Sequence, residues 1–308
     1  MNESKPCISV IINCYNGEEF VDSALSTVLA QTFTDWQLIF WDNQSIDGTR
    51  LLVQKYQDPR IHYYLAPTHT SLGEARNLAM KYADTEFVCF LDVDDLWNER
   101  FLQVAVGKLK NSEYAFCYTN YYAFNSQLKR INVTNRKTGI VTFGKLLESY
   151  DIGMSGCIFR KVESINFNTH YSLIEDYDFF LKLLHGRCAF FFEEPLFSYR
   201  MHEKSLTYSF KEGWAIEFQK EYVFFTSSLL NQDEQLKYKK QLDWLLVRII
   251  NAKINENIYN HEWKNVIRLC LGNCLKSPKL LFPLLSVVIG EKRYNRLRNK
   301  IQGSTYTI

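Results

Sequence analysis

Three aspartates follow an apolar segment of the sequence almost without interruption. Residues 87–91 are apolar, and Asp92, Asp94 and Asp95 come next, around a single valine. Carboxylates are rare in strands and are seldom fully buried without a partner, so a cluster at the end of a core strand requires an explanation. Grouped carboxylate oxygens suit Mg²⁺ or Mn²⁺, above all an ion shared with substrate phosphates. The alternative is that Asp94 or Asp95 caps a helix that begins near Trp97.

Other side chains that could do chemistry stand at the ends of further segments. Asp42 follows the apolar run 36–41, and Glu175 with Asp176 opens an apolar helical segment. His202 comes shortly after a strand-like segment near the middle of the chain. Because the carboxyl ends of parallel strands meet at one edge of a sheet, these side chains could share a cleft with the three aspartates.

Each of these residues also has a purely structural explanation. Asp42 could cap a turn, and the acidic pair that begins with Glu175 could stabilise the first turn of a helix through the helix dipole. His202 could be an ordinary surface histidine. Arg76 could be a surface residue of its helix, and Asp95 suits the helix cap best. The residues alone leave both explanations open.

The elements that must position these side chains alternate along the first half of the chain. Residues 7–14 and 36–41 are continuous apolar runs, which is typical of strands buried on both faces. Residues 18–31 and 72–83 carry apolar side chains at helical spacing. This alternation predicts an α/β fold with a mixed, mostly parallel sheet and helices on both faces. The first strand is followed neither by G-x-G-x-x-G nor by a Walker lysine motif.

The character of the sequence changes near residue 211. Long segments with helical periodicity follow and contain no strand signals, so we expect one α/β domain over residues 1–210 and a helical region over residues 211–308. Near the end, an apolar block is followed by several basic residues, and such a segment can lie on an anionic membrane surface. A helix packed on the protein with a solvated basic end is the alternative.

Composition excludes some classes of function. The net charge of +2 over 308 residues gives no electrostatic argument for binding nucleic acid. None of the eight cysteines forms a C-x-x-C pair, which favours reduced, buried thiols in a cytoplasmic protein. No apolar run reaches the roughly 20 residues that a membrane-spanning helix needs.

Five segments of the chain resemble those of the family 2 inverting glycosyltransferases, which have the GT-A fold. In order, they are SVIINCYNGEEFVDSALSTVLAQTF, LIFWDNQSIDGT, GEARNLA, FLDVDDLW and EDYDFFLKLL. Each segment is weak evidence alone, but the ordered set is specific and covers roughly residues 7–205. The chain departs from the family at Asn13 and Cys14, where many members have Pro-Thr, and at the bulky Trp41.

The resemblance implies roles for residues that would bind a sugar nucleotide. Tyr15 would lie against the nucleotide base, and Asp42 would accept a hydrogen bond from that base, commonly uracil. Asp92 and Asp94 match the DXD motif of the family, so Asp92 would face the ribose or a metal-bound water and Asp94 would bind Mg²⁺ or Mn²⁺. His202 matches a region that approaches the diphosphate or the metal.

The resemblance also implies the reaction. Asp176 would be the base that takes the proton of the acceptor hydroxyl, with Glu175 as its competitor. Attack from the face opposite the diphosphate gives inversion. The expected enzyme is a cytoplasmic glycosyltransferase that is peripheral on the inner face of the membrane. It would move a sugar from a nucleotide-sugar donor, expected to be a UDP-sugar, to a glycan or lipid-linked saccharide. The expected setting is bacterial surface polysaccharide synthesis. One alternative is a nucleotide-sugar-binding module without catalysis. Another is a nucleotidyltransferase, but that class expects a glycine- and lysine-rich phosphate loop near the first strand, which residues 15–20 do not supply.

Overall fold

The computed structural model describes most of the chain and separates it into two compact units. The described residues are 6–125, 131–132, 136–202, 212–289 and 293–294. The first unit comprises residues 1–143 and 151–202, and the second comprises residues 144–150 and 203–308. The predicted boundary between residues 210 and 211 lies outside the described residues, so that boundary stays a prediction.

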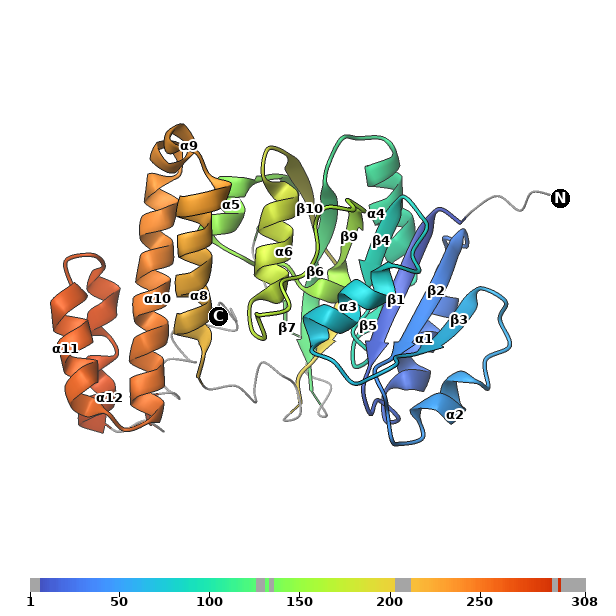
Figure 1. Cartoon of the computed structure of the whole chain (residues 1–308), viewed down its shortest axis with the longest axis horizontal. Coiled ribbons are helices and arrows are strands. Elements are labelled where there is room, and N and C mark those ends of the chain that lie inside the picture. Colours follow the sequence, from blue (N-terminus) through green and yellow to red (C-terminus); the bar gives the residue numbers. More distant parts are fainter. Residues whose placement is uncertain (1–5, 126–130, 133–135, 203–211, 290–292, 295–308) are drawn as a thin grey trace. The chain divides into compact units, whose positions relative to one another are not determined.

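The first unit is built on a ten-stranded mixed sheet (Figure 1). The strand order is β3-β2-β1-β4-β9-β6-β10-β5, with β7 paired to β6 and β8 paired to β10. The strands are β1 (Ile8–Cys14), β2 (Trp36–Asp42), β3 (Ile61–Leu65), β4 (Phe87–Phe90), β5 (Leu96–Trp97), β6 (Phe116–Phe124), β7 (Ile131–Asn132), β8 (Gly139–Thr142), β9 (Cys157–Arg160) and β10 (Cys188–Arg200). The mixed α/β fold predicted from the sequence is confirmed.

The four strands β3, β2, β1 and β4 run parallel, and β1 lies in the middle of them. Ile8 pairs with Trp36 of β2 and with Phe87 of β4, so the two neighbours of β1 keep nearly the same register. The apolar residues of β1 on both faces are buried, as a continuous β-branched run predicts. The carboxyl ends of β2 and β4, where Asp42 and Asp92 stand, therefore lie at the same edge.

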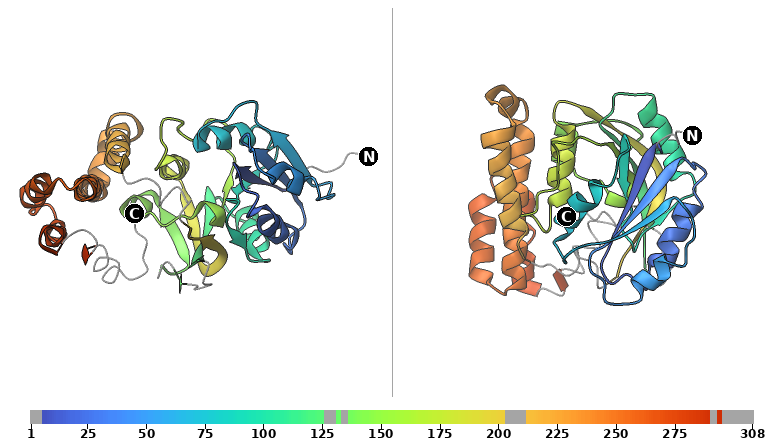
Figure 2. Two further views of the ribbon diagram at one scale, coloured as in Figure 1. Left: turned by 90° about the horizontal axis from the view of Figure 1, so that it is seen from below. Right: turned by 45° about the vertical axis from the view of Figure 1, so that its right-hand side comes forward.

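Helices cover both faces of this sheet (Figure 2). Helices α1 (Val21–Leu29), α2 (Thr49–Val53) and α4 (Phe101–Lys110) contribute to one apolar cluster with the side chains of β1, β2 and β4. Helices α3 (Leu72–Met80) and α6 (Glu175–Leu184) lie on the other face. There, Phe179 of α6 stacks on Phe167 at 4.1 Å between ring centroids, and Phe167 meets Phe90 of β4 edge-on at 5.5 Å.

The helix predicted to follow Trp97 is present as α4, but its predicted start near Trp97 is wrong. Leu96 and Trp97 form β5, which pairs with Ser198 and Phe197 of β10, and α4 begins only at Phe101. The indole N–H of Trp97 donates to the carbonyl oxygen of Ser155 at 2.5 Å, and the ring is buried. Tertiary packing against β10 decides the conformation here, and local sequence does not reveal it.

The described residues of the second unit form mainly helices, as the sequence predicts for the C-terminal region. They are α5 (Phe143–Glu148, at the border of the units), α8 (Trp214–Phe224), the π-helical turn Phe225–Leu229, α9 (Gln232–Lys237), α10 (Lys239–Tyr259), α11 (Trp263–Asn273), the 3₁₀ turn Pro278–Leu281 and α12 (Leu284–Ile289). The Glu256 carboxylate of α10 accepts the backbone N–H groups of Gly213 and Ala215, which satisfies free donors at the start of α8. Among the described residues, we find no helix with the length and apolarity required to cross a bilayer.

The cysteines of the chain are free thiols, and several are buried. Burial raises the pKa of Cys14 to about 12 and the pKa values of Cys89 and Cys157 well above the usual value. Since a raised pKa keeps a thiol protonated at mildly alkaline pH, and the thiolate is the nucleophile, we expect these three to resist iodoacetamide until the protein is unfolded. Mass spectrometry of labelled peptides tests this, with Cys274 as the partly exposed reference; equal labelling of Cys89 before and after denaturation would contradict it.

Candidate active site

The three aspartates lie on a tight turn at the carboxyl end of β4. Leu91 still donates its N–H to Ile11 of β1 at 2.9 Å, and the N–H of Asp95 then closes a turn onto the carbonyl of Asp92 at 2.9 Å. The three carboxylates differ in exposure. The Asp95 residue is only 2% exposed, whereas the side chains of Asp92 and Asp94 are 38% and 22% exposed. The turn therefore presents two of the three acids to solvent.

Asp95 is a structural residue inside the turn. One of its carboxylate oxygens accepts the hydroxyl of Ser155 at 2.6 Å, and the other accepts the N–H of Arg200 at 2.9 Å. Burial and the charges of Asp94 and Asp92 raise the pKa of Asp95 well above its usual value. The expectation that Asp95 caps the following helix is wrong, because this side chain instead ties the β4 turn to the end of β10.

Asp94 and His202 are brought together from distant parts of the chain. Oδ2 of Asp94 lies 2.8 Å from Nε2 of His202, and the side chain of Arg200 donates from Nε to the carbonyl of Asp94 at 2.7 Å. The imidazole ring also lies 5.1 Å from the ring of Phe20. Within the described part of the chain, Nδ1 of His202 is buried without a hydrogen-bond partner. The fold therefore brings Asp94 and His202, the two residues predicted to bind metal, within hydrogen-bond distance of each other.

This pair suits a metal ion that is completed by a substrate. A carboxylate oxygen and an imidazole nitrogen are both suitable ligands for Mn²⁺, and a carboxylate suits Mg²⁺. The described residues contain no group of three or more His, Cys, Asp or Glu side chains arranged to hold a metal. A set of two protein ligands fits an ion whose remaining positions are taken by phosphate oxygens and water, as is usual for Mg²⁺ in enzymes that act on phosphates.

Arg76 of α3 joins the aspartate turn to the start of α6. The residue is 4% exposed; its Nη2 donates to Asp92 at 3.2 Å and its Nη1 donates to Glu175 at 3.1 Å. Burial alone would lower the pKa of Arg76, but the charges of Asp92, Glu175 and Asp176 and the hydrogen bond to Asp92 together outweigh burial and raise that pKa. The explanation of Arg76 as a surface residue is wrong. Partial burial raises the pKa of Asp92, although Arg76 acts in the opposite direction.

The neighbouring Asn77 holds α3 in place. Its side chain donates to the carbonyl of Phe167 at 2.8 Å and accepts the N–H of Phe167 at 2.8 Å. This two-way contact fixes α3 against the segment that precedes α6. The position of Arg76 between two carboxylates therefore has support from the residue beside it.

Three acids occupy the first turn of α6 and differ in their surroundings. Glu175 is 7% exposed and is paired with Arg76, and Asp178 is 0% exposed with Lys182 at 2.7 Å. Asp176 is partly exposed, and its Oδ1 accepts the N–H of Tyr177 at 2.7 Å. The negative charge of Asp176 acts on both Asp92 and Arg76. The aspartate turn and the start of α6 thus share one electrostatic environment.

Asp42 and Tyr15 lie at the ends of β2 and β1. Asp42 is 1% exposed, its Oδ1 accepts the N–H of Ser45 at 2.7 Å, and its Oδ2 accepts the hydroxyl of Tyr63 at 2.6 Å. The carboxylate therefore does form the turn that was the alternative explanation, and its contact with a nucleotide base stays a prediction. Tyr15 is 49% exposed, and its ring lies 4.2 Å from that of His69.

Sequence reasoning missed Ser155, Arg200 and His69. Ser155 joins Asp95 to the backbone N–H of Asp92, to which its Oγ is an acceptor at 3.1 Å. His69 places Nδ1 2.9 Å from the carbonyl oxygen of Asn43, which holds the ring beside Tyr15. The sequence around Ser155 carries no chemical signal, whereas an isolated histidine in the loop between β3 and α3 could have identified His69.

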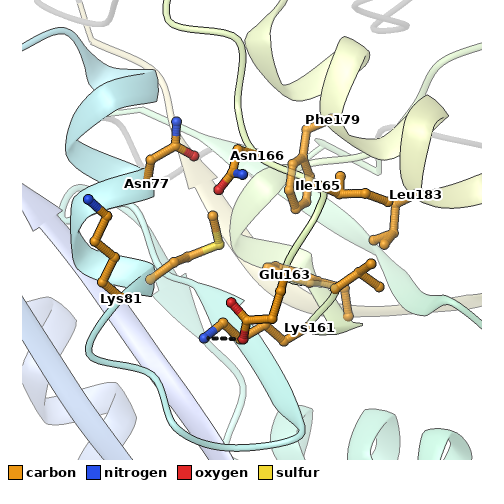
Figure 3. Close-up of a pocket in the computed structure, with 11 residues that line it drawn as sticks. Asn77, Lys81, Lys161, Glu163, Ile165, Asn166, Phe179 and Leu183 are labelled. Atoms are coloured by element: carbon orange, nitrogen blue, oxygen red, sulfur yellow. Dashed lines mark ion pairs between the residues drawn. The ribbon is translucent and has the colours of Figure 1, made fainter.

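A separate small pocket lies between α3, the segment after β9 and α6 (Figure 3). Its cavity volume is about 40 Å³. Lys161 lies at its wall, where its Nζ donates to the carbonyl of Ala83 at 2.8 Å and pairs with Glu163 at 2.9 Å. None of the predicted site residues lines this pocket, so we do not assign the site to it.

Comparisons with known proteins identify related sequences. The family described as "Glycosyl transferase family 2" matches residues 9–170, more than half of the 308 residues. The Escherichia coli protein named UDP-Glc:alpha-D-GlcNAc-diphosphoundecaprenol beta-1,3-glucosyltransferase WfgD is 31% identical over 178 residues. That match covers 58% of this chain and 69% of WfgD.

Solved structures share the fold at lower sequence identity. The structure of S. aureus TarS 1-349 in complex with UDP-GlcNAc superposes with a TM-score of 0.66 at 19% identity, covering 94% of this chain and 83% of that chain. The mannosyltransferase PcManGT from Pyrobaculum calidifontis, in complex with GDP-Man and Mn²⁺, gives a TM-score of 0.58 at 17% identity, covering 96% and 79%. Both are similar in fold over nearly the whole chain.

Proposed function

Because the chain belongs to glycosyl transferase family 2 and is a glycosyltransferase, we propose that it transfers a sugar from a nucleotide diphosphate to a hydroxyl of a glycan or lipid-linked saccharide. The observation that carries this proposal is the contact of Arg76 with both Asp92 and Glu175. It joins the two halves of the candidate site, one after β4 and the other at the start of α6. The product would have the inverted anomeric configuration.

The donor end of the site is proposed to lie along the carboxyl ends of β1, β2 and β4. Asp94 and His202 would hold Mg²⁺ or Mn²⁺, and Asp92 would face the ribose or a water on the metal. When bound, the metal supplies positive charge that stabilises the diphosphate leaving group. The exposed ring of Tyr15 would lie against the base, supported by His69. Asp42 would contact the base or would fix the turn beside it.

Asp176 is the proposed general base. A base must lie within hydrogen-bond reach of the acceptor hydroxyl and must be able to take its proton. Glu175 is a poorer candidate because it is buried and paired with Arg76, so a proton on Glu175 would break a buried ion pair. Asp176 is partly exposed and can face a substrate. Attack on the side opposite the diphosphate, with one proton transferred to Asp176, accounts for inversion in a single displacement.

The relatives indicate the class of donor and acceptor that we propose. WfgD is named for a UDP-Glc donor and a diphosphoundecaprenol-linked acceptor, and TarS was solved with UDP-GlcNAc. By analogy, we propose a UDP-sugar donor and a lipid-linked saccharide acceptor, in bacterial surface polysaccharide synthesis. An acceptor of this kind would bring the enzyme to the cytoplasmic side of the membrane. The fold and the motif residues do not determine which sugar is transferred or which linkage is formed.

Turnover of nucleotide sugars tests this function. The change is Asp94→Asn. We expect the apparent affinity for Mn²⁺ to become about tenfold to hundredfold weaker, a range typical of a disturbed metal site. The reason is that an amide is neutral and binds divalent cations less tightly than a carboxylate does. The measurement is release of UDP, GDP or dTDP from a panel of donor sugars across a range of Mn²⁺ concentrations.

Two outcomes would contradict the proposal. Binding of UDP-sugars without turnover of any donor in the panel would favour the non-catalytic binding module. Full activity of Asp94→Asn with unchanged dependence on Mn²⁺ would show that Asp94 does not bind the metal. Glu163→Gln is the matched control, because this acid of the same unit is 86% exposed and lies outside the site.

A further inference from the structure

Helix α11 presents apolar side chains to solvent in a row. Ile267, Leu271 and Leu275 are 38%, 57% and 100% exposed, and they recur at intervals of four residues, which places them along one side of the helix and the turn that follows it. Scattered single apolar residues are normal on a protein surface, but a contiguous row calls for an explanation. We call these three residues the apolar row.

The opposite side of α11 is already packed. Val266 and Cys270 are fully buried and belong to one cluster with Ile254 and Ile258 of α10 and with Leu280. The helix is therefore held in the second unit by its inner side, and the apolar row is not needed for that packing. Among the described residues, the packing of α11 on α10 leaves the apolar row exposed.

Basic side chains accompany the apolar row. Lys264 and Arg268 are exposed on the adjoining side of α11, and Lys276 and Lys279 are exposed just after the helix. Glu262 stands at the N-cap of α11, and no Asp or Glu follows it up to residue 289, although the whole chain has a net charge of only +2. The positive charge is thus concentrated around the apolar row. We call the apolar row with these four residues the α11 face.

We propose that the α11 face docks on a membrane surface that contains anionic lipids. Apolar side chains flanked by Lys and Arg suit the boundary between headgroups and acyl chains, where the apolar row would be buried and the cations would meet lipid phosphates. Pairing of this face with a second copy is disfavoured, because a two-fold interface would bring the same four cations of both copies together. The combination of apolar and basic groups, with Glu262 as the one acid at the start of α11 and none up to residue 289, therefore favours lipid as the occupant.

Most basic residues of the C-terminal segment suggested by the sequence for membrane binding lie outside the described residues, so that interpretation stays a prediction. The α11 face begins earlier in the chain, at Lys264. The inference does not depend on the catalytic roles in the first unit. It goes beyond the proposed function by naming the surface that would bring the enzyme to a lipid-linked acceptor.

The test is binding of the full-length protein to vesicles of phosphatidylcholine with phosphatidylglycerol, compared with phosphatidylcholine alone. We expect binding only to the anionic vesicles. The variant Lys264→Gln/Arg268→Gln should bind about 30-fold more weakly, since each basic residue near such a surface contributes about a fivefold effect. The variant Leu271→Ser/Leu275→Ser should lose on the order of tenfold per leucine, because less apolar area enters the interface.

Leu236→Ser is the matched control for the leucine variants. Leu236 is 75% exposed, but it lies in α9 beside Asp233 and Glu234, so its removal should leave vesicle binding unchanged. Circular dichroism checks that each variant is folded. Equal binding to both vesicle types, or unchanged binding of the two α11 variants, would overturn the proposal. A wild-type dimer that ignores vesicles and becomes monomeric in Leu271→Ser/Leu275→Ser would overturn it in favour of self-association.

The same variants separate this proposal from the proposed function. All the proposed site residues belong to the first unit, so we expect both α11 variants to keep release of nucleotide from the donor in solution. Vesicle binding without any turnover would count against the proposed reaction and leave the α11 face intact. Turnover with vesicle binding unaffected by the α11 variants would count against the α11 face alone.

Discussion

Replacing Asp176 by asparagine is expected to lower kcat about 10²- to 10⁴-fold, the range that a general base contributes. The amide cannot take the proton of the acceptor hydroxyl, but it keeps the shape of the side chain and can still accept the N–H of Tyr177. Donor binding should therefore persist, and KM for the donor should change little. Steady-state transfer to an acceptor, together with titration of UDP binding, measures both quantities.

Glu175→Gln is the informative comparison for Asp176→Asn. Glu175 is paired with the buried Arg76, so its neutralisation should lower stability first and affect turnover only through the position of Asp92. Loss of turnover in Glu175→Gln with an unchanged melting temperature, combined with an active Asp176→Asn, would reverse the assignment of the base. Lys182 and Asp178 are unsuitable controls because their pairing stabilises α6 itself.

Much of the fold follows from patterns that are local in sequence. The run 7–14 is apolar at successive positions, so it predicts a strand buried on both faces, and β1 is an interior strand with this burial. Helical spacing predicts α1 and α3, and the change near residue 211 predicts the C-terminal helices. The meeting of Asp42 and Asp92 at one edge follows from parallel strands alone.

The parts that failed depend on contacts between distant segments. Trp97 joins a strand because β10 lies beside it, and Asp95 is buried because Ser155 and the backbone of Arg200 come to it. The sequence around residue 95 gives no indication of these partners. The surface interpretation of Arg76 failed because its partner Glu175 is distant in the sequence. The two side chains meet only in the folded protein, where the start of α6 lies beside α3.

Replacing Arg76 by methionine is expected to lower the free energy of unfolding by about 3–5 kcal/mol, as is typical when one member of a buried ion pair is removed. Methionine fills similar space, but Glu175 would be left as a buried carboxylate without its guanidinium, and Asp92 would lose its cation. Urea unfolding measures the change, with a signal that reports on the first unit. Activity should fall with it, because Arg76 positions the two halves of the site.

Arg100→Met is the matched control for this prediction. Arg100 pairs with Glu194, but the two side chains are 51% and 48% exposed, so that pair should contribute no more than about 1 kcal/mol. Adding Glu175→Met to Arg76→Met should recover part of the lost stability, because a buried charge without a partner costs more than an apolar pair of similar size. Equal losses in Arg76→Met and Arg100→Met would show that the guanidinium between Asp92 and Glu175 does not hold the site together. A large loss for Arg76→Met that Glu175→Met partly reverses would locate the effect at this buried charge, and therefore at the junction between the aspartate turn and α6.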